Sequence, residues 1–319
     1  MRHGVEYGLK KAVVALEEGQ EILLDSSEKK LDFVSKISEK DEFYLPFGSG
    51  ADKFALACAK KGAKIFRIPT AKLAELRKGK SGEYAQLLLE TAQNSPEFFY
   101  SIQGKDIKIL EVGMLLQQYY IVQKEIRMKA QQRLFAALED DFLVRGEPVA
   151  ELEKELRREI AEHPMFAPAL KEEKRLYRAI DKAVKDLPIY QSLFKPIKGV
   201  GAVIAGRIIY GIQDIRRFPN EAHLKNYAGY GFSGNNQIQK RRKGEVASWN
   251  NFLKQGIFLF TDQVNRRSNC LPWNKMLIER KEYERQKFPD ISKGHIHAKA
   301  CRYLGQKFLE YIFRKWRKF

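Results

Sequence analysis

The stretch PIKGVGAVIAGRII, residues 196–209, places Gly199 and Gly201 between two apolar runs of a lysine-rich chain. Glycines two residues apart permit a tight turn whose backbone N–H groups point outward. A helix that starts at Ala202 adds its free N-terminal N–H groups, and Lys198 adds positive charge beside them. This pattern is typical of the hairpin of a helix-hairpin-helix, which holds a nucleic-acid backbone without reading its bases. An ordinary glycine turn between two helices is the alternative.

Positive charge is concentrated in the C-terminal part of the chain. The 319 residues carry 58 Lys and Arg against 40 Asp and Glu, a formal net charge of +18. From residue 196 onward 25 cations oppose 9 acids, which gives +16, whereas residues 1–195 hold the other 33 cations and 31 acids, which gives +2. This asymmetry predicts a polyanionic partner, most simply DNA or RNA. A solvated basic surface without a partner is the alternative.

Composition excludes several other classes of protein. The sequence has no apolar run of 18 residues and no signal peptide, which predicts a cytoplasmic protein without a membrane partner. The three cysteines, Cys58, Cys270 and Cys301, are far apart and odd in number, so they form neither a disulfide framework nor a metal-ligand spacing. The five histidines are scattered as well.

Strand and helix signals alternate in the N-terminal part of the chain. Residues 3–25 read as a meander of three strands, HGVEYGL, KAVVALEEG and QEILLD. A serine-capped helix at 26–37, a buried strand at 42–48, a helix closed by Gly62 and a strand stopped by Pro69 follow. This is the element order of a ribonuclease-H-like mixed sheet, although the pattern alone also fits other α/β folds.

Long helices are predicted between residues 107 and 195, where LQQYYIVQKEIRMKAQQRLFAAL and VAELEKELRREIAEH show charged, heptad-like spacing. They indicate a coiled-coil arm, although a helix hairpin packed on its own domain fits equally well. The expected fold is therefore α/β plus all-α. We expect a ribonuclease-H-like domain at 1–106, a helical arm at 107–195, and a basic helical domain with the helix-hairpin-helix at 196–319.

The run IKGVGAVIAGRIIYGIQDIRRFPNEAHLKNYAGYGFSG resembles the C-terminal domain of the insertion-sequence one-ten transposases, the family of Piv-type DNA invertases and bridge-RNA-guided recombinases. The family pattern is an IPGIG-like turn, an apolar helix, a gDi.rF motif, a short helix and an aGl motif. The three motifs correspond here to residues 197–201, 214–218 and 228–229. WNNFLKQGIFLF and IHAKACRYLGQKFLEYIFRKW also resemble the closing helices of that family.

The resemblance implies two cooperating sites. An N-terminal RuvC-like domain would hold four acidic residues that bind Mg²⁺, and a C-terminal serine would form a covalent link to DNA. DNA and a structured guide RNA are the partners that the resemblance implies. A homo-oligomer, dimer or tetramer, is expected through the helical arm.

Only one of the four acidic positions of the family holds an acid in this chain. Glu6 stands at the first position, although a charge at the edge of a strand is the alternative reading of this residue. The other three positions hold residues without a carboxylate: Leu45, Gly82 and Ala85. Two metal ions need several carboxylate ligands, and Asp52 or Glu83 would have to compensate. We therefore expect the sheet to remain as a scaffold and RNA-binding surface that has lost its metal chemistry.

Ser233 is the candidate nucleophile, because the resemblance places a serine-glycine pair shortly after the aGl motif. A serine that attacks a phosphate needs positive charge nearby. That charge, and a clamp for phosphate, is expected from the four cations Lys240, Arg241, Arg242 and Lys243. A serine in a glycine-rich turn is the alternative. Ser248 is a rival nucleophile, although it reads better as the N-cap of a helix.

Two functions stay open at this point. The chain is expected to be a nucleic-acid-binding protein of transposase or site-specific recombinase type, acting in DNA transposition or recombination with a structured RNA as its guide. The alternative is a catalytically inactive descendant that binds RNA or DNA for regulation or targeting. The retained serine and basic segment favour an enzyme, whereas the missing acids favour the descendant.

Overall fold

The computed structural model describes residues 1–319 except 9–10, 18, 49, 79–83, 103, 233–237, 239–248 and most of 130–165. The described chain forms two compact units, Met1–Glu111 and Val112–Phe319. The boundary expected at residues 106 and 107 lies near this division. The further separation of an arm from a basic domain at residue 195 stays a prediction.

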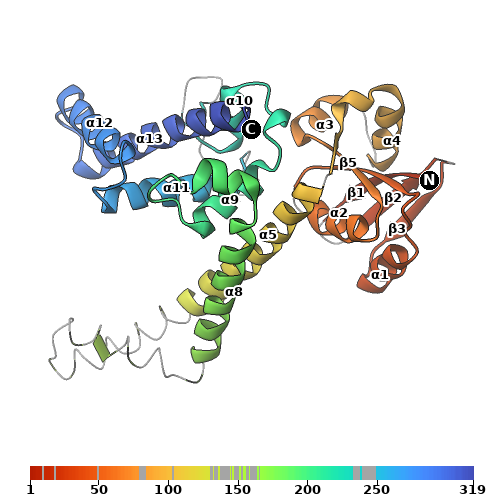
Figure 1. The fold of residues 1–319 in the computed structure, drawn as a ribbon, viewed down its shortest axis with the longest axis horizontal. Helices are drawn as coiled ribbons and strands as arrows, with labels where there is room; N and C mark the ends of the chain where they lie inside the picture. Colours follow the sequence, from red (N-terminus) through yellow and green to blue (C-terminus); the bar gives the residue numbers. More distant parts are fainter. Residues whose placement is uncertain are drawn as a thin grey trace. The chain divides into compact units, whose positions relative to one another are not determined.

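A six-stranded mixed sheet forms the centre of the first unit (Figure 1). Its strands are, in chain order, β1 (Arg2–Tyr7), β2 (Ala12–Leu16), β3 (Glu21–Leu24), β4 (Glu42–Pro46), β5 (Lys64–Ile68) and β6 (Tyr100–Ser101). The first three strands form an antiparallel meander, β4 and β5 continue parallel to β1, and β6 pairs antiparallel with β5. The strand order β3-β2-β1-β4-β5-β6 confirms a mixed α/β sheet and is compatible with the ribonuclease-H-like expectation.

Helices pack on both faces of this sheet. They are α1 (Ser27–Ser35), α2 (Ala51–Lys60), α3 (Thr70–Leu76), α4 (Ala85–Asn94) and the 3₁₀ turn η1 (Pro96–Phe98). On one face, Phe33 of α1 and Phe54 of α2 pack around Phe43 of β4. On the other face α4 approaches β1 so closely that a Cβ on Gly4 would overlap the Ala85 carbonyl oxygen. Glycine is therefore required at position 4.

Two helix ends of the first unit follow the sequence signals. The side chain of Ser26 caps α1 by accepting a hydrogen bond from Lys29 N at 3.1 Å. Gly62, immediately after α2, has a φ of +89°, a conformation that glycine adopts readily. The serine cap and the glycine stop predicted from the sequence are thus both confirmed.

The second unit is helical in the part that the structure describes, and α5 leads into it from the first. Its helices are α5 (Gly104–Tyr120), the π-helix η2 (Ile121–Met128), α8 (Ala167–Lys185), the π-helix η3 (Tyr190–Phe194), α9 (Ala202–Ile212), the 3₁₀ turn η4 (Ile215–Arg217), α10 (Glu221–Tyr227), α11 (Asn251–Arg266), α12 (Trp273–Lys287) and α13 (Lys293–Trp316). Helix α8 lies beside η2, where Glu173 pairs with Arg127. Most of the second predicted arm segment falls outside the described residues.

Helices α9 and α11 pack antiparallel at the centre of the second unit. A Cβ on Gly211 would lie 2.7 Å from Leu253 Cβ, and one on Gly256 would lie 3.0 Å from Ile208 Cγ1. Glycine on both helices therefore allows the two backbones to approach closely. The N-terminus of α9 consequently lies beside the C-terminal end of α11, where a Cβ on Gly199 would meet Gln263 Cβ at 3.7 Å.

Candidate nucleic-acid interface

The glycine turn has the backbone geometry that the sequence predicts. Gly199 has a φ of +91°, and the extended Gly201 precedes α9 as its N-cap without a capping side chain. The first N–H groups of a helix have no acceptor within it, so those of α9 can donate to an anion. Lys198 is exposed beside this turn and forms no ion pair within the described residues. The structure thus brings together Lys198, Gly199 and Gly201.

The structure adds Arg267, a cation that the sequence analysis did not single out, to the candidate residues. A Cβ on Gly199 would lie 3.0 Å from Cys270 Sγ, so the segment after α11 packs against the turn. Cys270 N donates to the carbonyl oxygen of Arg267 at 3.3 Å, and the Arg267 side chain is exposed. Its neighbour Arg266 is partly neutralised by Asp262 at 3.0 Å. The only sequence signal was the pair of arginines after an amphipathic helix, a pattern too common among helix ends to indicate a binding site.

The gDi.rF motif, residues 214–218, has a structural role. The Asp214 side chain accepts a hydrogen bond from Arg216 N at 2.9 Å, which caps η4. The buried Arg217 donates from Nε to Ile212 O at 3.0 Å and from Nη2 to Gly211 O at 2.9 Å. Arg217 thereby satisfies carbonyl groups at the C-terminal end of α9, where a helix lacks internal partners. This motif stabilises the helix that follows the glycine turn.

The candidate nucleophile and the basic cluster lie outside the described residues, but both ends of their segment are described. Ser233, Ser248 and the cations Lys240, Arg241, Arg242 and Lys243 all belong to this segment. At its start, Phe232 forms an antiparallel bridge with Ile238. At its end, Asn250 caps α11 by accepting from Leu253 N at 2.9 Å, so the N-cap expected at Ser248 is wrong. The better cap is the Asn that directly precedes the helix.

Two side chains of α13 hold the start of this segment. Arg302 donates from Nη2 to Gly231 O at 2.5 Å, and Gln306 donates from Nε2 to Tyr230 O at 2.7 Å. Gly229 has a φ of +72°, which turns the chain after α10. Near the C-terminal end of α13, Trp316 is buried and packs edge-to-face with Phe194.

In the first unit, Glu6 contacts the beginning of α4. Its Oε2 accepts a hydrogen bond from Tyr84 N at 2.7 Å, which places the carboxylate at the positive end of the α4 dipole. The resemblance led us to expect two of the family's acidic positions at 82 and 85, of which the structure describes only position 85, directly after Tyr84. Ala85, however, is fully buried and offers no ligand atom from its side chain.

The other acidic position of the sheet does not supply a ligand either. Leu45 is fully buried, and the alternation of side chains along β4 puts it on the face of Phe43, opposite to that of Tyr44 and Gly4. Asp52, which would have to compensate, is buried against Arg67 and accepts from Gly48 N at 3.2 Å. The described residues therefore do not fit a two-metal site, and among them no group of three or more His, Cys, Asp or Glu converges.

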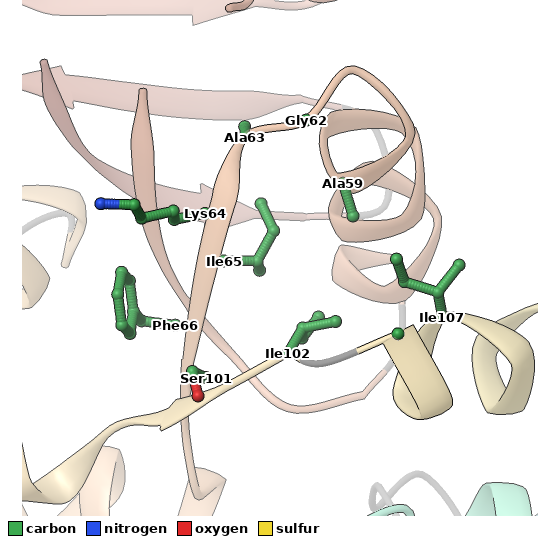
Figure 2. Close-up of a pocket in the computed structure, with 10 residues that line it drawn as sticks. Ala59, Gly62, Ala63, Lys64, Ile65, Phe66, Ser101, Ile102 and Ile107 are labelled. Carbon is green, nitrogen blue, oxygen red and sulfur yellow. The ribbon is translucent and has the colours of Figure 1, made fainter. Parts of the chain in front are cut away.

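A cavity of about 330 Å³ opens between β5, the end of α2 and the start of α5 (Figure 2). The side chains of Ile65, Ile102 and Ile107 point toward it, whereas Lys64 points to the other side of the strand. The Lys64 ammonium pairs there with Glu42 at 3.2 Å. Lys64 is the one ionisable residue among those that line the cavity, and its side chain points away, so these residues supply no ionisable group for acid-base chemistry there.

Comparison with known proteins agrees with the C-terminal motifs. Residues 191–242 match a family model described as the Transposase IS116/IS110/IS902 family. No curated protein matches the chain. Among the described residues no helix is long and apolar enough to cross a membrane. The glycine turn, α9 and the beginning of the basic segment thus lie in a region similar to these transposases, which supports a transposition-related function that acts on DNA.

Proposed function

We propose that this protein binds the backbone of duplex DNA through residues 196–319 and acts in transposition or site-specific recombination. The observation that carries the proposal is the glycine turn before α9. Its uncapped helix N-terminus and the exposed Lys198 lie within the segment similar to transposases. Backbone N–H groups and cations of this kind position a protein on phosphates without reading sequence.

Catalysis within this proposal would rest on Ser233, with the cations of residues 240–243 stabilising charge on the attacked phosphate. A structured RNA as guide and a homo-oligomer formed through the helical arm belong to the same proposal. They are supported by the resemblance of the C-terminal motifs to bridge-RNA-guided recombinases.

A second function is favoured by a specific observation in the first unit. Glu6 is committed to the N-terminus of α4, and the second and fourth acidic positions are the buried Leu45 and Ala85. A sheet with this set of side chains suits a scaffold better than a metal-dependent catalyst. The alternative proposal is therefore a non-catalytic descendant that binds RNA or DNA for regulation or targeting.

Salt dependence tests the proposed DNA binding. The double variant Arg241→Ala/Arg242→Ala should lower the slope of log K against log salt by about 2, because each phosphate contact contributes roughly 0.9 on duplex DNA. The measurement is fluorescence anisotropy of a short labelled duplex with the full-length protein.

The matched control removes two cations from the first unit. Lys29→Ala/Lys36→Ala changes net charge equally, but the two exposed lysines, one on α1 and one at its C-cap, pair with Asp25 and Asp32. Its slope should equal that of the wild type. An equal slope for the arginine variant as well would mean that Arg241 and Arg242 face away from the DNA.

A further inference from the structure

Two cations converge at the base of the segment 233–248. Arg302 of α13 donates from Nη1 to Gly229 O at 3.4 Å and from Nη2 to Gly231 O at 2.5 Å. Lys254 of α11 packs on the same glycine, since a Cβ there would lie 3.0 Å from Lys254 Cδ. Both positive charges are therefore located where the chain leaves α10 and where it enters α11.

No acid neutralises these two cations within the part of the chain that the structure describes. Two other lysines of this unit, Lys225 and Lys307, do have an acidic partner: both pair with the carboxylate of Glu310, at 3.1 and 2.9 Å. Burial lowers the pKa of Lys254, and the nearby charge of Arg302 lowers it further. Burial also lowers the pKa of Arg302. Two like charges partly withdrawn from water are costly, and an anion between them would relieve that cost.

Aromatic rings hold the two cations in place. Lys254 Nζ lies 3.7 Å from the centroid of the Trp249 ring. Arg302 Cζ lies 5.5 Å from the Phe232 ring centroid and 5.8 Å from that of Tyr230. Cation–π contacts fix a cation without neutralising it. The Lys254 ammonium group has three donors and makes no hydrogen bond to any residue that the structure describes, so these donors are available to a ligand.

We propose that Lys254 and Arg302 together bind one phosphate group of the DNA backbone at the base of the segment 233–248. The inference rests on the proposed function, because it assumes that duplex DNA is the polyanion held by the second unit. Lys254 would contact the phosphate directly. Arg302 would hold the backbone of residues 229–231 in place, and its positive charge would attract the phosphate. Phe232, whose ring lies 5.5 Å from Arg302 Cζ, directly precedes the candidate nucleophile Ser233 in the sequence.

Lys254→Met is the variant that tests this site, because methionine preserves an aliphatic stem on Gly229 and removes only the charge. Binding of a labelled DNA duplex should weaken roughly tenfold at low salt, as for loss of a charged hydrogen bond. The slope of log K against log salt should fall by about 0.9. Lys254→Arg should retain the wild-type slope. Near-UV circular dichroism verifies that each variant is folded.

Lys225→Met is the matched control, since that lysine lies on α10 of the same unit but pairs with Glu310 of α13. Its slope should equal the wild-type slope. A steep wild-type slope that Lys254→Met leaves unchanged overturns this inference and leaves the proposed function intact. Equal losses in both variants also overturn it, as does a larger loss on an RNA duplex of the same sequence. Wild-type protein that binds duplex DNA without salt dependence contradicts the proposed function itself.

Discussion

Asp52→Ala is expected to destabilise the unit Met1–Glu111 by about 3–5 kcal/mol, the usual effect of removing one partner from a buried ion pair. Asp52 and Arg67 are 1% and 2% exposed, and the Arg67 guanidinium also lies 4.3 Å from the Phe47 ring centroid. Without the Asp52 carboxylate, a charge remains in a site that excludes water. Such a loss is a large part of the stability of a typical domain.

Hydrogen exchange resolved by mass spectrometry measures this effect locally. Amides of β4 and β5 should lose protection, whereas those of α9 and α11 serve as the internal reference in the same molecule. The double variant Asp52→Leu/Arg67→Met should recover most of the lost protection, because apolar residues of similar volume can replace a buried pair. Unchanged protection in Asp52→Ala would mean that the pair contributes little to this unit.

Ser233→Ala is expected to abolish a covalent protein–DNA adduct while leaving DNA affinity within about fivefold, since one hydroxyl contributes roughly 1 kcal/mol to binding. A recombinase nucleophile forms a bond to a DNA phosphate that survives denaturation, whereas ionic contacts do not. The measurement is a denaturant-resistant shift on a gel, with the wild type supplied with the DNA and RNA recovered alongside it from its source cells.

Ser248→Ala is the matched control and should retain the adduct. Adducts that persist in Ser233→Ala but vanish in Ser248→Ala would transfer the nucleophile to Ser248. The absence of an adduct from wild-type protein with every recovered nucleic acid would favour the non-catalytic function.

Local signals made most of the first unit predictable. The meander, the serine cap at Ser26 and the glycine stop at Gly62 each depend on a few neighbouring residues. No neighbouring residue indicates that position 4 must be glycine. The requirement comes from the carbonyl group of Ala85, which lies near Gly4 only in the folded unit. Asp52 is a similar case: the sequence made it a possible metal ligand, but in the folded unit its carboxylate pairs with Arg67.

The candidate interface was predictable only where it depends on backbone conformation. Gly199 made the turn predictable because its φ of +91° is a conformation that glycine favours, whereas the extended Gly201 has a backbone conformation open to other residues. Lys254 and Arg302 became candidates through their contacts with Gly229, and Arg267 through its hydrogen bond to Cys270, which packs against Gly199. Single-sequence reasoning cannot pair such distant residues, and it cannot tell a cation with an acidic partner from one without.

Cross-linking of the full-length protein to duplex DNA, followed by mass spectrometry of the linked peptides, tests whether residues 196–319 hold the DNA backbone. We expect the linked peptides to fall within residues 196–319, above all those that contain Lys198, Lys254, Arg267 or the cations of 240–243. The signal should decline as salt rises, because phosphate contacts release counterions. Cross-links distributed equally over residues 1–195, or a signal indifferent to salt, would contradict it.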